Sequence, residues 1–331
     1  FLKSAGDLPQ FAVTAFINAL EQNPGIEQCL QELGNEAHIY FGTGVGDYPT
    51  QYDSSIALYK ARRRWDRFWG NVDRCQARAT YIELTEVEQL IYCEQQSITD
   101  PLTADVYADG LDEFEEQWER HWCDASDQLQ LYLAEAKAIQ RVPVNAANGG
   151  KANVIKNKRS AMKKLNKDWG CPTEPWAAVD PKLIWNIANA PAAQISMLGK
   201  ITGPAIAPVG ACASFGVALK LAQNAIRLGE AKAVVVGMVD PTPHPLLVGA
   251  FYRANVASND GEASKPLQGM KGTHIAGGAC LWIVGDVDYM RSKGFTPVGM
   301  EIVGIGLSSD ADHIITPSAE GPLASANAAL A

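Results

Sequence analysis

The stretch that decides the fold runs from Gly203 to Gly216 and reads GPAIAPVGACASFG. Its prolines and glycines predict an extended segment and a turn, because both residue types interrupt regular helices. The residues that follow, 213–229, carry apolar side chains at helical spacing and end at Gly229, a residue type that commonly terminates helices. The stretch therefore predicts a strand-to-helix turn, with Cys212 in or just before the first helical turn.

The helix predicted after this turn is amphipathic. Its apolar side chains recur every three or four positions, so they share one face of the helix. These residues are Val217, Leu221, Ala225 and Leu228, with Ala218, Ala222 and Ile226 beside them.

Cys212 lies where a thiolate would be stabilised. Unpaired backbone N–H groups and the positive end of the helix dipole meet in the first turn. A thiolate at a sharp turn can attack an acyl group, and the neighbouring N–H groups can hold the oxyanion that forms. Most cysteines are instead small buried residues. The position of Cys212 alone supports the two interpretations about equally.

The C-terminal half of the chain alternates short apolar runs with helical patterns. The runs 234–236, 281–284 and 302–305 are typical of strands, the first of them buried on both faces. Helices are predicted between them, over 182–198, 213–229 and 287–293. Near the start, residues 38–41 form a further strand-like run, followed by the glycine-rich turn 42–47. This alternation predicts an α/β fold.

The middle of the chain has a different composition. From residue 51 to about 170 it is rich in Glu, Gln, Arg, Trp and Tyr, which favours helices. Phe114, Trp118 and Trp122 form one apolar stripe, and acidic residues occupy the other faces. We therefore predict a helical insertion over 51–175, between the two core segments 1–50 and 176–331.

Composition excludes several classes of protein. The 331 residues carry 28 basic and 37 acidic side chains, a net charge of −9, which argues against nucleic acid as the main partner. The seven cysteines form no CxxC pair, so we predict neither a disulfide framework nor a structural zinc site, and a reducing, cytoplasmic location. No apolar run approaches the ~18 residues of a membrane-spanning helix.

Several segments together resemble the β-ketoacyl synthases. Residues 209–214 (VGACAS) match the family's T-A-C-(A/S/T)-S segment, and residues 225–231 (AIRLGEA) match its I-R-x-G-E-A-D segment. Residues 233–237 resemble the family's next strand, and residues 42–46 resemble its G-S-G-x-G turn. Residues 265–267 and 277–279 match the R-P-F-D…G-E-G-A-G block. Residues 308–313, 316–317 and Gly321 match the S-S-D-A-x-H…P…G segment. The resemblance covers about 38–47 and 176–331.

This resemblance implies a thiolase-like fold, layered αβαβα, in a homodimer or heterodimer. It implies a decarboxylative Claisen condensation of acyl and malonyl thioesters, carried by acyl carrier protein, in fatty acid or polyketide synthesis. Cys212 matches the nucleophile, Val45 a position that lines the acyl pocket, and Thr316 a position in the substrate-binding segment. It implies no cofactor and no metal.

A basic stretch is the candidate surface for the acidic carrier protein. Its residues are Lys151, Lys156, Lys158, Arg159, Lys163, Lys164 and Lys167, and we expect Lys158, Arg159, Lys163 and Lys164 to dock the carrier. The simpler alternative is a solvated surface, or a contact with the acidic residues 109–119.

The sequence also departs from the family. The two catalytic histidines belong to later motifs, H-G-T-x-T and G-H-x-x-G, and the chain ends at Ala331 before either, so we expect an incomplete chain. Gly278 replaces the acid of the G-E-G-A-G block, and His274 replaces the aromatic residue before it. Two alternatives therefore stay open: another thiolase-fold acyltransferase acting on coenzyme A thioesters, and a catalytically incomplete partner subunit.

Two other motifs carry weaker signals. The turn 42–46 lacks the G-x-G-x-x-G spacing of a dinucleotide site, and no acidic residue follows at the expected distance. His121 and Cys123 resemble half of a metal site without a second half. We expect each of the five histidines to be structural.

Overall fold

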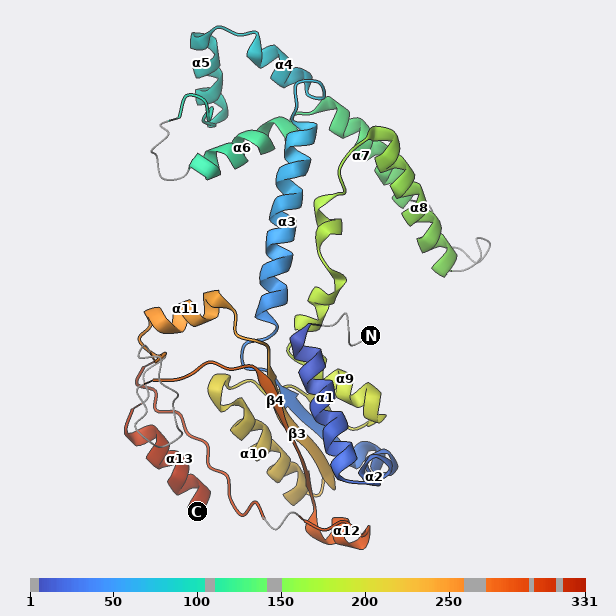
Figure 1. Cartoon of the computed structure of the whole chain (residues 1–331), viewed down its shortest axis with the longest axis vertical. Helices are drawn as coiled ribbons and strands as arrows, with labels where there is room; N and C mark the ends of the chain where they lie inside the picture. Colours follow the sequence, from blue (N-terminus) through green and yellow to red (C-terminus); the bar gives the residue numbers. More distant parts are fainter. Residues whose placement is uncertain (1–5, 105–110, 142–150, 259–271, 298–300, 314–317) are drawn as a thin grey trace. The chain divides into compact units, whose positions relative to one another are not determined.

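The computed structural model describes residues 6–104, 111–141, 151–258, 272–297, 301–313 and 318–331, and the chain divides into two compact units (Figure 1). Unit 1 comprises Phe1–Tyr52 and Pro181–Ala331, and unit 2 comprises Asp53–Asp180. Each unit has buried hydrophobic clusters of its own.

Unit 1 is built around a four-stranded sheet. The strands are β1 (Ala37–Gly42), β2 (Ala205–Ile206), β3 (Ala233–Asp240) and β4 (Gly278–Gly285). Their order is β2-β1-β3-β4, with β1 parallel to both β2 and β3, and β4 antiparallel to β3. In this register Ile39 lies opposite Val235, and Val235 lies opposite Ile283.

Helices cover both faces of this sheet. The helices of unit 1 are α1 (Asp7–Gln22), α2 (Ile26–Leu33), α9 (Ala190–Gly199), α10 (Ser214–Arg227), α11 (Pro245–Arg253), α12 (Val287–Ser292) and α13 (Glu320–Leu330), together with the start of α3 (Tyr48–Trp69). Helices α1 and α9 contact one face, and α10 contacts β1 and β3 on the other. The described part of unit 1 thus contains an α-β-α arrangement (Figure 1).

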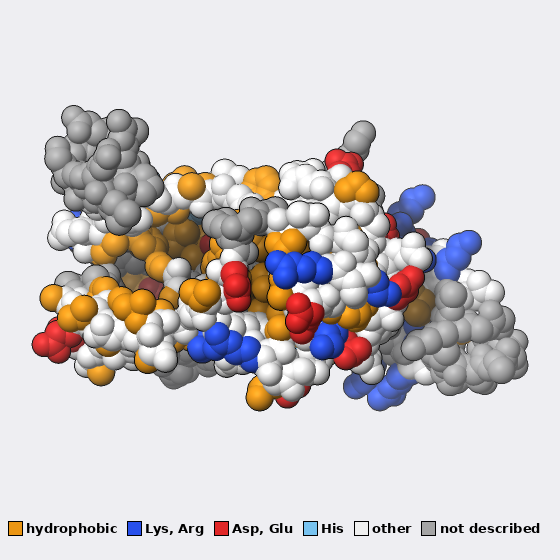
Figure 2. Space-filling model, turned by 90° about the horizontal axis from the view of Figure 1, so that it is seen from below, with side chains coloured by type: hydrophobic (Ala, Val, Ile, Leu, Met, Phe, Trp, Pro, Cys, Tyr) orange, Lys and Arg blue, Asp and Glu red, His pale blue; other side chains and the backbone are white. Residues whose placement is uncertain are grey.

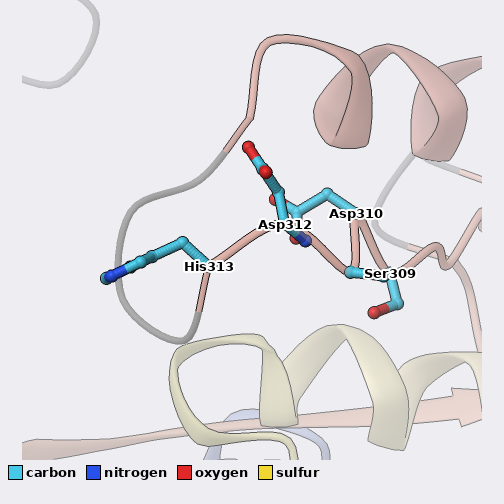
Figure 3. A pocket seen from close by; sticks show the side chains of 5 residues that line it. Ser309, Asp310, Asp312 and His313 are labelled. Atoms are coloured by element: carbon cyan, nitrogen blue, oxygen red, sulfur yellow. The ribbon is translucent and has the colours of Figure 1, made fainter.

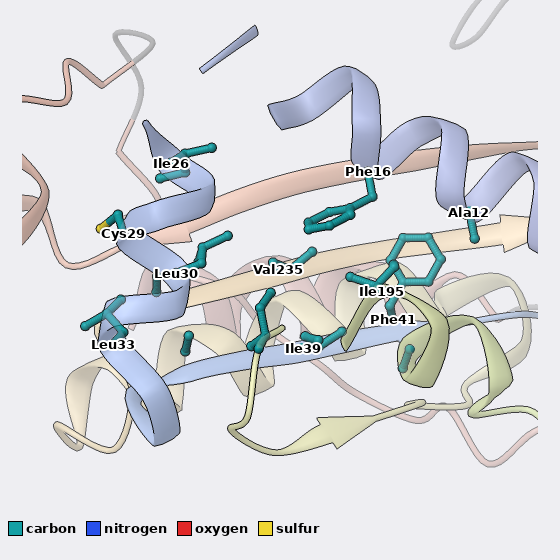
Figure 4. Close-up of a cluster of buried hydrophobic side chains, with 14 of the residues drawn as sticks. Ala12, Phe16, Ile26, Cys29, Leu30, Leu33, Ile39, Phe41, Ile195 and Val235 are labelled. Carbon is teal, nitrogen blue, oxygen red and sulfur yellow. The ribbon is translucent and has the colours of Figure 1, made fainter. Parts of the chain in front are cut away.

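The strands divide their side chains between the two faces. Ile39, Phe41 and Val235 point into the cluster that contains Phe16 of α1 and Ile195 of α9 (Figure 4). Tyr40, Val234 and Val236 alternate with them and pack against alanines of α10. All six residues of β1 are buried, as expected for a parallel strand covered on both sides.

Among the described residues, the α10 side of the sheet is only partly covered at β4. Trp282 of β4 remains 46% exposed and its ring meets Phe215 of α10 edge-on, with the centroids 5.0 Å apart. Leu307 and Leu323 are also exposed. Figure 2 shows apolar side chains around a hollow on one face of unit 1.

The structure contains the strands predicted over 38–41, 234–236 and 281–284, but the strand predicted over 302–305 is wrong. Residues 301–310 have no regular secondary structure and pair with no strand of the described sheet. Side chains of α10 take the place of a ladder here. Gln223 Nε2 donates to the Ile302 carbonyl at 3.2 Å, and Arg227 Nη2 donates to the Val303 carbonyl at 2.8 Å.

Unit 2 is helical in its described part. It contains most of α3, with α4 (Gln76–Ile82), α5 (Glu86–Gln96), α6 (Leu111–Asp124), α7 (Asp127–Gln140) and α8 (Lys151–Trp169). One cluster contains Trp65, Trp69, Cys123, Leu129, Tyr132 and Leu165, and a second contains Cys75, Tyr81, Cys93, Trp118 and Trp122. The predicted stripe of α6 therefore supplies core residues to unit 2.

The acidic side chains of α6 are balanced by α3. Arg63 donates to Glu115 at 2.9 Å and to Glu119 at 2.8 Å, and Arg67 also pairs with Glu119. Within the described ranges, every helix is too short or too polar to cross a lipid bilayer.

Candidate functional site

The candidate site of unit 1 lies where its parallel strands end. Residues 43–47 follow β1, residues 207–213 follow β2, and Asp240 is the last residue of β3. Since β1 is parallel to both neighbours, the three strands bring these segments to one edge of the sheet. The carboxyl ends of parallel strands are the usual place for ligand sites in α/β folds.

Cys212 lies at this edge with its side chain exposed. It occupies a single 3-10 turn, Ala211–Ala213, directly before α10. The preceding Ala211 has a φ of 47°, in the left-handed region that residues with a Cβ rarely adopt. The chain therefore reverses sharply at Cys212 and presents its thiol at the amino end of α10.

Ser214, the first residue of α10, holds this turn. Its side chain is fully buried. The hydroxyl donates to the Ala211 carbonyl at 2.7 Å and accepts from the Gly210 N–H at 2.8 Å. One hydroxyl thus satisfies a backbone acceptor and a backbone donor on the chain that enters the turn.

The loop after β1 is fixed by Asp240. Its Oδ1 accepts from the Thr43 hydroxyl at 2.9 Å, from the Gly44 N–H at 2.9 Å and from the Val45 N–H at 3.1 Å. Thr43 Oγ1 in turn accepts from the Gly46 N–H at 2.9 Å. The loop conformation therefore depends on a carboxylate supplied by the neighbouring strand.

The loop after β1 and the turn of Cys212 approach each other closely. A Cβ placed on Gly42 would lie 2.7 Å from the Pro208 carbonyl oxygen. A Cβ on Gly44 would lie 3.2 Å from Asp240 Oδ2 and 3.6 Å from the Ala211 carbonyl oxygen. The two glycines thus allow the loop to pass directly beside the turn. Val45, 40% exposed, lies in this same loop.

A histidine lies on the same edge, in the segment that follows β3. The ring of His244 lies 4.5 Å from the ring of Tyr52 and 5.7 Å from that of Tyr48, between centroids. His244 Nδ1 accepts from the Leu246 N–H at 3.2 Å and so caps α11. These contacts give His244 a structural role.

The segment 309–313 forms a separate hollow of about 280 Å³ (Figure 3). Asp310 Oδ2 accepts from the Ser318 N–H at 2.9 Å, and this hydrogen bond lowers the pKa of Asp310. Ser309, Asp312 and His313 also line the hollow. Thr316, the predicted substrate-binding residue beside this segment, lies outside the described residues.

The predicted carrier-docking residues lie on α8, in unit 2. Arg159, Lys163 and Lys164 are exposed, and half-buried Lys158 donates to the Gln140 carbonyl at 2.6 Å. Leu165 on the same helix is buried in the cluster that contains Trp65 and Trp69. Helix α8 therefore presents a cationic side to solvent.

Asp240 and Ser214 are the site residues that the sequence analysis missed. Ser214 lies in the VGACAS motif, which gives no sign of its role in the turn. Asp240 carried a usable signal, because a polar residue that ends an apolar parallel strand lies where such sheets bind ligands. Groups of three or more possible metal ligands are absent from the described residues.

Comparisons with known proteins give a consistent result. Residues 134–285 match the family described as "Beta-ketoacyl synthase, N-terminal domain". A 3-oxoacyl-[acyl-carrier-protein] synthase homolog of Saccharomyces cerevisiae is 33% identical over 141 residues, which is 43% of this chain and 31% of the relative. The 3-oxoacyl-[acyl-carrier-protein] synthase 2 of Rhizobium meliloti is 29% identical over 141 residues, 41% of this chain and 33% of the relative.

Among solved structures, a β-ketoacyl synthase from Burkholderia phymatum has a TM-score of 0.43 and 21% identity, over 51% of this chain and 41% of that chain. The chain spans about a third of the length of the curated relatives it matches.

The matched range contains β2, the turn of Cys212, α10, β3 and β4, and also α8 of unit 2. It overlaps the predicted insertion from residue 134 onward. The family match and the mixed sheet together confirm the resemblance and the predicted α/β, thiolase-like fold class.

Proposed function

Since residues 134–285 match the N-terminal domain of the β-ketoacyl synthases, we propose that Cys212 is the acyl-accepting nucleophile of a β-ketoacyl synthase. The observation that carries this proposal is the exposed thiol in the strained turn before α10, at the carboxyl edge of the parallel strands. The reaction is the decarboxylative Claisen condensation of acyl and malonyl thioesters, in fatty acid or polyketide synthesis.

In the first half of the reaction the Cys212 thiolate attacks the carbonyl carbon of an acyl thioester. A new C–S bond forms, the old one breaks, and the carrier thiolate leaves and takes up a proton. Backbone N–H groups at the amino end of α10, including that of Cys212, hold the oxyanion of the tetrahedral intermediate. Ser214 keeps the turn in the geometry that presents them.

In the second half the malonyl thioester loses CO₂, and the carbanion that remains attacks the acyl-Cys212 carbonyl. A C–C bond forms, the C–S bond to Cys212 breaks, and the thiolate is regenerated. We assign the residues of this chain chiefly to the first half, the acyl transfer. Val45 lines the acyl pocket, which its loop beside the Cys212 turn supports, and we retain Thr316 as a second substrate-binding position.

The partner in this proposal is acyl carrier protein with acyl or malonyl groups on its phosphopantetheine arm. The exposed cations of α8, Arg159, Lys163 and Lys164, with Lys158 beside them, dock its acidic surface. The enzyme acts in the cytoplasm as a homodimer or heterodimer. Residues 51–175 are an insertion into the synthase core.

Acylation of Cys212 tests the proposal directly. With acyl carrier or coenzyme A thioesters, intact mass should show one acyl group per chain. Cys212→Ala should lower its rate of formation at least ~100-fold, because removing a nucleophile removes the covalent route. Cys280→Ala is the matched control, because Cys280 is also exposed in unit 1. The proposal fails if Cys212→Ala is acylated as fast as the unmodified chain, and a preference for coenzyme A donors would favour the acyltransferase alternative.

Charge reversal on α8 tests the docking surface. Replacing Lys158, Arg159, Lys163 and Lys164 by glutamate should weaken carrier binding by about tenfold or more and reduce its salt dependence. Arg62→Glu with Arg64→Glu, exposed on α3 of the same unit, is the control. Titration of labelled carrier at two salt concentrations measures both quantities. Equal affinity and equal salt dependence in all three proteins would show that the carrier docks elsewhere.

A further inference from the structure

The carboxylate of Asp240 makes an unusual concentration of hydrogen bonds. A single oxygen, Oδ1, receives the Thr43 hydroxyl at 2.9 Å and the Gly44 and Val45 N–H groups at 2.9 and 3.1 Å. All three donors come from consecutive residues about 200 positions away in the sequence. Hydrogen bonds to a carboxylate are stronger than those between neutral groups, so three of them on one oxygen hold the loop firmly.

Loss of this oxygen would leave three donors without their acceptor. Thr43 is 3% exposed, so its hydroxyl cannot turn to bulk water without moving the backbone. An unsatisfied buried donor is costly, and a loop in this position would shift to find new acceptors. The conformation of residues 43–45 is therefore conditional on Asp240.

The direction of such a shift matters because the loop lies between Asp240 and the backbone of Ala211. A Cβ built on Gly44 would have Asp240 Oδ2 at 3.2 Å and the Ala211 carbonyl oxygen at 3.6 Å. Asp240 thus holds the loop against the residue that precedes Cys212. A displaced loop changes the distance between Val45 and Cys212, while Ser214 still holds the Cys212 turn through separate bonds.

We infer that Asp240 is a positioning residue that sets which acyl chain lengths the Cys212 site accepts. It acts through Val45: by fixing the loop after β1, it fixes the wall of the space into which an acyl chain on Cys212 extends. This inference rests on the proposed function, since it takes Cys212 as the acylated residue and Val45 as a pocket residue. It predicts a change in selectivity that is separable from the reactivity of the thiol.

The chain provides a matched control in Asp286. This aspartate directly follows β4, and its Oδ1 accepts from the Tyr289 N–H at 2.9 Å. Because β4 is antiparallel to β3, with Gly285 opposite Ala233, Asp286 lies at the opposite edge of the sheet. It is likewise an aspartate at a strand end that accepts from a backbone N–H, and it also lies 3.6 Å from Lys232 Nζ, but it is remote from the loop after β1.

The experiment compares Asp240→Ala, Asp240→Asn, Thr43→Val and Asp286→Asn in the full chain. Acyl transfer to Cys212 is followed by intact mass, with butyryl and hexadecanoyl thioesters as separate donors, to obtain for each the maximal acylation rate constant and the half-saturating donor concentration. The rate of Cys212 alkylation by iodoacetamide is measured in parallel. Asparagine keeps an acceptor oxygen in the same place, and Thr43→Val removes one of the three donors at nearly constant volume.

Asp240→Ala should change the ratio of the acylation efficiencies (rate constant divided by half-saturating concentration) of the two donors by about tenfold or more, chiefly through the half-saturating concentration, with alkylation changed less than about threefold. Asp240→Asn should restore the ratio to within about threefold, Thr43→Val should fall between, and Asp286→Asn should match the unmodified chain. If Asp240→Ala does not fold, Thr43→Val still tests the inference.

An equal effect on both donors, or no effect, would overturn the inference and leave the proposed function intact. No acylation of Cys212 in the unmodified chain would overturn both.

Discussion

Units 1 and 2 stabilise their interiors with different chemistry. The clusters of unit 1 consist mainly of aliphatic side chains between a sheet and its helices. Those of unit 2 are dominated by aromatic rings; Trp69, for example, lies within 5.7 Å of Phe68, Tyr132 and Trp169 between ring centroids. Small and branched side chains fill the regularly spaced faces of the sheet, whereas in unit 2 aromatic rings, each of which buries a large area, fill the interior between helices.

The buried polar groups differ in the same way. In unit 1, Thr43 and Ser214 gather at one edge of the sheet and fix the loops beside Cys212. In unit 2 buried carboxylates accept from tyrosines inside the aromatic clusters, Asp100 from Tyr81 at 3.0 Å and Glu174 from Tyr132 at 2.7 Å. We therefore expect substitutions of the buried polar groups beside Cys212 to alter its site, and substitutions inside the aromatic clusters of unit 2 to alter stability.

The largest expected effect on stability is in unit 2. Trp69→Ala removes a fully buried ring and should lower the free energy of unfolding by about 3–5 kcal/mol. Urea unfolding followed by tryptophan fluorescence measures this loss. Trp176→Ala is the control, since Trp176 is 65% exposed and should cost under about 1 kcal/mol. A changed alkylation rate of Cys212 in Trp69→Ala, under conditions where unit 2 remains folded, would contradict the expected difference between the two units.

A smaller effect is expected at Asp66, a carboxylate buried in unit 2. Asp66 is 5% exposed and its Oδ2 has no hydrogen-bond partner among the described residues. Burial raises the pKa of Asp66 above its ordinary value, so the folded state holds the proton more tightly than the unfolded chain. Stability contributed by this group is therefore lost as pH rises from about 4 through the folded-state pKa.

Asp66→Asn should accordingly stabilise the chain by about 1–2 kcal/mol at pH 7 and hardly at all at pH 4. Urea unfolding at several pH values measures the difference. Asp53→Asn, exposed on the same helix, should change stability by less than about 0.5 kcal/mol at every pH. A gain that is independent of pH would contradict the ionisation argument.

The smallest expected effect is in unit 1, at Ala211. Its φ of 47° costs about 1 kcal/mol for a residue with a Cβ. Ala211→Gly relieves that strain but increases the freedom of the unfolded chain, so we expect a net gain of about 0.5 kcal/mol in thermal unfolding. Ala213→Gly, at a φ of −91°, should instead destabilise. Equal shifts of the unfolding temperature in both variants would show that backbone strain at Ala211 does not affect stability.

Much of the fold was predictable from residues 203–241, because buried strands and amphipathic helices leave simple patterns. The helix after Cys212 extends close to its predicted range, but Leu221 and Leu228 of its apolar stripe remain exposed. Ala218 and Ala222 are buried instead, because small side chains let α10 lie close to the sheet. Hydropathy ranks the leucines higher, so the periodicity alone does not reveal which side faces the core.

The site was less predictable than the fold. The motif around Cys212 is visible in the sequence. The hydrogen bonds that the loop after β1 donates to Asp240 depend on the order of the strands, which the local sequence does not encode. The incorrect strand at 302–305 has a related cause. Its β-branched residues suit a strand, but a strand forms only beside another strand with unpaired backbone groups. Here Gln223 and Arg227 of α10 donate to the backbone carbonyls of this segment instead.

The close approach of Gly42 and Gly44 to their neighbours has a consequence for how this site can diversify. A methyl group at Gly42 would meet the Pro208 carbonyl oxygen at 2.7 Å, and one at Gly44 would crowd Asp240. A side chain at Gly42 would therefore force the backbone at Pro208 to shift, whereas a side chain at Gly44 would require the Asp240 carboxylate to give way slightly. Val45, whose side chain is 40% exposed, donates its backbone N–H to Asp240, and this hydrogen bond does not depend on the identity of the side chain. If Val45 lines the acyl pocket, as proposed, its side chain can be exchanged, and the substrate preference with it, while Asp240 still holds the backbone of the loop.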